Sequence, residues 1–162
     1  MLFWWESIVA GAAATVAMTA AMQAGSAMGM TSMNMGLILG SMFKTDEAGA
    51  KRLGWALHGL NGLVFGLGLG YGVVWWALDP SLDSAWWIGL LFGLLHGGIA
   101  SAAMPMMSAM HPRVRPGAAA GEVLLPRFGF GGSGFGSMTP LGILAGHLVF
   151  GLVWGVVFQA LA

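Results

Sequence analysis

The sequence predicts an all-α integral membrane protein, a four-helix bundle that forms a single transmembrane domain over residues 1–162. Hydrophobic residues make up 57% of the chain and charged residues 7%, and the mean hydropathy is +0.81. Ordinary soluble domains do not have this composition. Crossing about 30 Å of hydrocarbon takes roughly 20 mostly apolar residues. Four stretches of this length are present, so the lipid bilayer is the first expected partner.

The predicted membrane helices cover residues 3–25, 53–78, 85–109 and 140–161. The second follows Lys51 and Arg52, and the third ends before His111. Residues 31–43 are apolar but too short to span a bilayer. They predict a short interfacial or re-entrant helix in the first cytoplasmic connection.

Charge predicts the orientation of these helices. Four crossings place both termini on one side and the two longer connections on the other. Every basic residue falls on the side of those connections: Lys44, Lys51, Arg52, Arg113, Arg115 and Arg127. By the positive-inside rule the connections are cytoplasmic and both termini are not, as expected for a bacterial inner-membrane protein. Tryptophans mark the opposite interface: Trp4, Trp5, Trp75, Trp76, Trp86 and Trp87.

The two halves of the chain resemble each other. Trp4-Trp5 recurs as Trp86-Trp87, and the run at 63–67 recurs at 148–152. This predicts a parallel duplication of a two-helix hairpin, with repeats over residues 1–80 and 83–162. The alternative is chance coincidence among residues that are common in membrane helices.

Glycines recur every fourth residue on three helices and predict close helix packing. They are Gly62, Gly66, Gly89, Gly93, Gly97, Gly146, Gly151 and Gly155. Such faces serve either internal packing of the bundle or association with a homo-oligomer partner or another membrane subunit.

Few polar side chains lie at membrane depth, and these are functional candidates because burying them in lipid is costly. The predicted layer contains His58, His96, His147, Met18, Met22 and Met104. Imidazole and thioether suit Cu(I), and paired imidazoles suit haem b iron. The structural alternative is that each histidine forms an interhelical hydrogen bond. A second group at the expected cytoplasmic mouth, able to capture a soft cation, contains Met106, Met107, Met110 and His111.

Other functions find less support in the sequence. Six Lys and Arg balance six Asp and Glu, so nucleic acid is not an expected partner. The chain has no cysteine and no paired-carboxylate or nucleophile-base motif, so a non-enzymatic protein is expected. The glycine-rich run at 128–138 predicts a flexible loop, and Glu6 is expected at the outer interface in contact with water or headgroups.

These observations favour a membrane subunit or helper protein that packs within a homo-oligomer or a larger complex. Two alternatives stay open: a Cu(I) or haem b binding protein, and a small oligomeric transporter or channel.

Overall fold

The computed structural model describes residues 4–64, 75, 77–78, 81–114 and 121–162, and the secondary structure of these residues is entirely helical. The elements are α1 (Trp4–Ala27), α2 (Met35–Gly40), α3 (Glu47–Val64), α5 (Leu82–Met110), the 3-10 helix η2 (Phe130–Phe135) and α6 (Thr139–Leu161). The predicted short helix of the first connection is present as α2. It begins where the Asn34 side chain accepts a hydrogen bond from the Leu37 N–H at 2.8 Å.

Three helices are long and apolar enough to cross a membrane, namely α1, α5 and α6. They match three of the four predicted spans to within three residues at each end. The prediction of four spans is not confirmed, because the count within the described ranges is three. The second predicted span begins six residues early, at Glu47 instead of 53, because Asp46 accepts a hydrogen bond from the Gly49 N–H. The structure follows it only to Val64, and most of residues 65–78 lie outside the described ranges.

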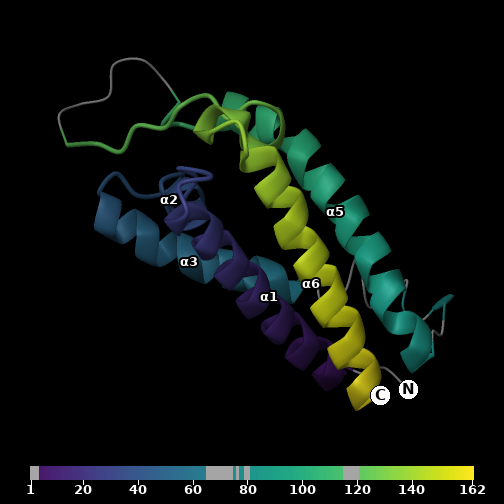
Figure 1. The fold of residues 1–162 in the computed structure, drawn as a ribbon. Helices are drawn as coiled ribbons and strands as arrows, with labels where there is room; N and C mark the ends of the chain where they lie inside the picture. The colour runs from purple at the N-terminus through teal and green to yellow at the C-terminus, as the bar shows by residue number, and fades with distance from the viewer. Residues whose placement is uncertain (1–3, 65–74, 76, 79–80, 115–120) are drawn as a thin grey trace.

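The helices form a row in the order α3, α1, α6, α5 (Figure 1). The closest contact is that between α5 and α6, where glycines of the two helices face each other. The start of α1 and the end of α6 lie at one end of the molecule, and α2 and η2 lie at the other (Figure 1). We call the end that holds α2 and η2 the cap end. The proposed duplication is not tested by this arrangement and stays a prediction.

Away from the cap end, a hydrophobic cluster joins α1, α5 and α6 around tryptophan rings. Trp75 is only 2% exposed, and its ring lies 5.2 Å from that of Trp154, centroid to centroid. Its indole N–H donates to Gln159 Oε1 at 2.9 Å. Trp75 is therefore a core residue, not the interfacial one that its sequence neighbourhood predicts. Trp5, Trp86 and Trp87 are exposed, as an interfacial belt requires.

The two long connections pack against each other at the cap end. The Ser32 N–H donates to the Phe135 carbonyl at 2.9 Å, and the Thr31 and Thr139 hydroxyls lie 2.7 Å apart. Arg113 pairs with Glu122 at 3.2 Å and donates from Nε to the Ser41 carbonyl. These bonds tie segments that are far apart in the sequence into one folded cap.

The glycine-rich run is part of this cap, so the prediction of a flexible loop is wrong. Phe128 and Phe135 are buried in a second hydrophobic cluster with Met33, Ile38 and Met104. Gly131 and Gly132 have φ values of 56° and 71°, which favour glycine. The glycines allow a tight turn that carries both rings inward.

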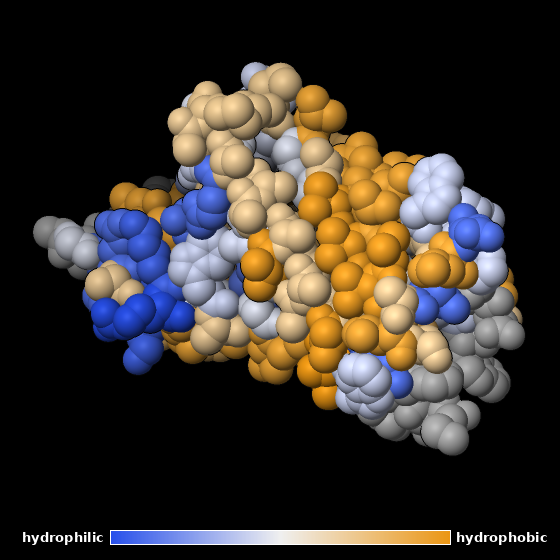
Figure 2. Space-filling model, turned by 60° about the horizontal axis from the view of Figure 1, so that its bottom comes forward, coloured by the Kyte–Doolittle hydropathy of each residue, from blue (hydrophilic) through white to orange (hydrophobic). Residues whose placement is uncertain are grey.

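Figure 2 shows a hydrophobic belt across the middle of the molecule, with hydrophilic residues gathered at either end of that face. A water-soluble fold would place such a belt inside. Together with the three long apolar helices, this surface indicates a membrane protein.

Candidate functional site

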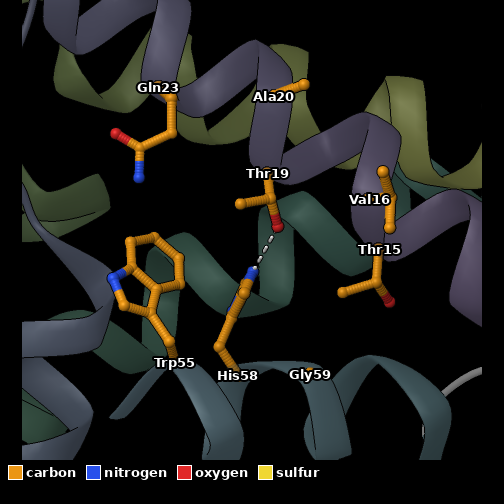
Figure 3. A pocket seen from close by; sticks show the side chains of 8 residues that line it. All are labelled: Thr15, Val16, Thr19, Ala20, Gln23, Trp55, His58 and Gly59. Atoms are coloured by element: carbon orange, nitrogen blue, oxygen red, sulfur yellow. Dashed lines mark hydrogen bonds between the residues drawn. The ribbon is translucent and has the colours of Figure 1, made fainter. Parts of the chain in front are cut away.

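A groove of about 370 Å³ opens between α1 and α3, within the hydrophobic part of both helices (Figure 3). The described residues that line it come from these two helices: Thr15, Val16, Thr19, Ala20, Gln23, Trp55, His58 and Gly59. The lining is mostly apolar, with a hydroxyl, an imidazole, an amide and an indole placed around it. This composition is typical of small-molecule sites, which are concave, largely apolar and carry a few polar groups.

Two polar groups meet at the centre of the groove. His58 Nε2 lies 3.2 Å from Thr19 Oγ1, and the hydrogen bond joins α3 to α1 (Figure 3). The Trp55 ring meets the His58 ring edge to face, with centroids 5.6 Å apart. Thr15 behaves differently, because its hydroxyl donates to the Gly11 carbonyl of its own helix at 2.6 Å. Of the two threonines, Thr19 is therefore the one whose hydroxyl forms a hydrogen bond across the groove.

Small residues set the width of the groove. A Cβ added to Gly62 would lie 3.0 Å from Thr15 Cβ, so α1 and α3 are in close contact there. One turn nearer the cap end, a Cβ on Gly59 would meet nothing within 4 Å. Ala20 on the facing helix is short and exposed. The helices touch at Gly62 and leave space beside Gly59.

The structure brings His96 and His147 of the predicted histidine and methionine layer together. Their rings meet edge to face with centroids 4.6 Å apart, on α5 and α6. His147 Nδ1 donates to the Ile143 carbonyl at 2.8 Å, so the proton is on Nδ1 and Nε2 keeps its lone pair. His58 bonds to Thr19 instead.

The methionines of that layer divide between the two ends of the core. A Cβ on Gly146, next to His147, would lie 3.6 Å from Met18 Cγ and 3.5 Å from Met22 Cγ. Met104 packs instead in the cap cluster, beside Ile143. Among the residues that the structure describes, no three His, Asp or Glu side chains are grouped as a metal site.

The residues predicted at the cytoplasmic mouth do not converge. Met106 and Met110 are exposed, while Met107 packs against the cap cluster. His111 is 2% exposed, its Nδ1 accepts from the Arg113 N–H at 3.1 Å, and its Nε2 donates to the Ile38 carbonyl at 2.9 Å. Both ring nitrogens are therefore occupied in holding the cap together.

The predicted packing glycines act inside the protein. Four of them lie where α5 and α6 touch: Gly89, Gly93, Gly151 and Gly155. Gly97 faces the side chain of His147. Gly66 lies outside the described residues.

Glu6 is a buried group that the sequence places wrongly. It is 5% exposed instead of lying at the interface, and within the described part of the chain no hydrogen-bond partner reaches its Oε2. Glu6 is the third residue of α1, and the neighbouring Ser7 is equally buried. The sequence carries no signal for this burial, because the rotation of α1 about its axis depends on contacts with other helices.

Chemically, the described residues that line the groove supply hydrogen-bonding groups that can hold a small molecule. The hydroxyl of Thr19 and the ring of His58 can each donate or accept a hydrogen bond, depending on the histidine tautomer. The second feature, the His96–His147 pair with nearby thioethers, offers soft-metal ligands. Comparisons with family models, curated proteins and solved structures give no match to this chain.

Proposed function

We propose that the protein is a non-enzymatic membrane subunit or helper that associates laterally, with a second copy or another membrane protein, through the outer face of α5. The observation that carries the proposal is Gly98. A Cβ there would meet nothing within 4 Å, so this glycine is not needed for packing inside the monomer.

The surroundings of Gly98 support this assignment. Ala102 lies one turn further along α5 and is also exposed, giving two small residues four apart on an outward face. Leu94, Leu95 and Ile99 flank them and are exposed as well. Small residues four apart let the backbones of two membrane helices approach closely, and flanking side chains then pack around the contact.

The other glycines of α5 support the choice of face by contrast. Gly89, Gly93 and Gly97 are covered by α6. They are unsuited to binding a partner, because replacing them would disturb the fold first.

The test is the oligomeric state of the protein after extraction in a mild detergent, together with cross-linking in native membranes. Gly98→Leu should abolish the oligomer or the co-purifying partner. Gly142→Leu on α6 is the matched control, because a Cβ at Gly142 also meets nothing within 4 Å. A wild-type protein that is monomeric in both assays, or an oligomer that survives Gly98→Leu, would remove the proposal.

A second candidate function is binding of Cu(I) or haem b. The His96–His147 contact favours Cu(I) in particular, together with the fixed Nδ1–H of His147, because an orienting hydrogen bond on one ring nitrogen is typical of a histidine that binds metal through the other. Visible spectra of oxidised and reduced protein, together with metal analysis, test for bound haem or copper. His147→Ala should abolish the bound chromophore or copper. Met106→Leu is the control and should not, because Met106 is exposed. A colourless, metal-free protein that takes up neither would leave the pair as a packing contact.

Transport has less support. In the described residues, Phe128 and Phe135 fill the core at the cap end. A pathway would then need more than one copy of the chain.

A further inference from the structure

We propose that the groove between α1 and α3 binds the ring of a neutral lipid-phase molecule of the isoprenoid quinone class, with its apolar tail lying outside along the helices. This site is separate from the α5 face and does not depend on association there.

Position restricts where a ligand can come from. The groove lies beside Thr15, which is near the middle of α1, and α1 is one of the helices able to span a membrane. Val16 and Ala20 at its edge are exposed, so it opens sideways from the helix pair. A molecule that enters here comes from the lipid phase.

Charge restricts the head group. None of the described residues that line the groove is Lys, Arg, Asp or Glu. A phosphate or carboxylate buried there would lack a counter-charge, which is costly in an apolar setting. The occupant is therefore uncharged.

Shape and hydrogen bonding indicate a flat ring that carries oxygen atoms. A volume of about 370 Å³ is near the lower limit for pockets that hold small organic ligands, so it accommodates a ring and not a whole lipid. Trp55 provides an aromatic wall, and Gln23 presents its amide toward the same space (Figure 3).

The His58–Thr19 pair suits both redox forms of such a ring. If Nε2 carries the proton, it donates to Thr19 Oγ1, and the threonine hydroxyl can donate to a quinone carbonyl. If Nε2 is unprotonated, the threonine donates to it, and Oγ1 can accept from a quinol hydroxyl. Neither arrangement changes the charge of the site.

The test uses ubiquinone with a single isoprene unit, measured by equilibrium dialysis of the protein in dodecyl maltoside micelles against empty micelles. Wild-type protein should show saturable binding beyond partition into the micelle. Quenching of tryptophan fluorescence by the quinone should be smaller in Trp55→Phe.

Variants locate the site. Ala20→Leu fills the groove from α1 and should weaken binding by about tenfold or more, a change equivalent to losing about 1.4 kcal/mol. Ala12→Leu is the matched control, because Ala12 is also exposed on α1 but does not line the groove. Gly59→Leu should act like Ala20→Leu from the α3 side. Thr19→Val should weaken binding about three- to tenfold, as expected for loss of one neutral hydrogen bond, while thermal unfolding shows that each variant is folded.

Three results would overturn the proposal. One is the absence of saturable binding to the wild type. Another is equal affinity in the Ala20→Leu and Ala12→Leu proteins. The third is displacement of the quinone by an equal concentration of anionic phospholipid, which would assign the groove to ordinary lipid.

Discussion

Gly93 of α5 lies directly against the backbone of His147 and Leu148 in α6, and a Cβ added to Gly93 would be 2.9 Å from Leu148 Cα. Backbone atoms at this distance cannot rotate away as a side chain can. The contact therefore fixes how closely α5 and α6 approach, and it places His147 beside His96.

Replacing Gly93 is expected to destabilise the fold. Gly93→Leu forces α5 and α6 apart, and overpacking of this kind costs about 1–3 kcal/mol or more. Thermal unfolding in detergent, followed by circular dichroism, measures the loss. Gly142→Leu introduces the same side chain where space is open and should have little effect. Equal melting temperatures for the two variants would contradict the packing described here.

Labelling of single cysteines will decide whether the segment between α2 and α5 crosses the membrane. The chain has no cysteine of its own, so Lys44→Cys and Asp83→Cys, both at exposed positions, report unambiguously. We expect a membrane-impermeant maleimide to label Asp83→Cys in spheroplasts and Lys44→Cys only after lysis, because basic connections stay in the cytoplasm. Ala162→Cys should behave like Asp83→Cys. Labelling of Lys44→Cys and Asp83→Cys from the same side would show that residues 45–82 do not cross.

The stability of the cap should decrease as the pH falls. Burial lowers the pKa of His111; the hydrogen bond to the Ile38 carbonyl opposes this effect, and the charge of Arg113 adds to it. The folded ring therefore stays neutral, whereas the unfolded ring takes up a proton below its ordinary pKa of about 6.5. The contribution of His111 to the free energy of unfolding is fully present above about pH 6.5 and is lost as the pH falls toward the lowered pKa of the folded protein.

Melting temperatures between about pH 7.5 and 5.5 test this dependence. His111→Gln cannot titrate, so its melting temperature should fall less over this interval than that of the wild type. The other histidines titrate in both proteins, and the difference between the two slopes isolates His111. Parallel slopes would show that His111 contributes nothing to the pH dependence.

The aromatic residues of the glycine-rich run are expected to differ sharply in importance. Phe128 is fully buried against Phe135 and His111, so Phe128→Ala leaves a cavity and should cost about 3–5 kcal/mol. Phe130, two residues further on, is exposed, so Phe130→Ala is the control and should cost little. Urea or thermal unfolding of the two variants in the same detergent gives the comparison. A cap that tolerates both substitutions equally would be a loose loop after all.

The sequence by itself determined the features that depend on local composition. Hydropathy summed over about 20 residues identified α1, α5 and α6, because a helix of that length and apolarity needs no tertiary partner to be recognised. It also located α2, and two of the three helices marked by glycine spacing, α5 and α6, are in the closest contact.

Only the tertiary structure decided which partner each side chain meets. Hydropathy could not show that Trp75 is buried against Trp154 while Trp86 faces outward, since both are tryptophans near the end of an apolar stretch. Nor could the spacing of residues along the chain show that His58 bonds Thr19, or that the rings of His96 and His147 contact each other. The rotation of each helix about its axis decides these pairs. That rotation is fixed by contacts between segments distant in the chain, such as Gly93 with His147 and Gly62 with Thr15.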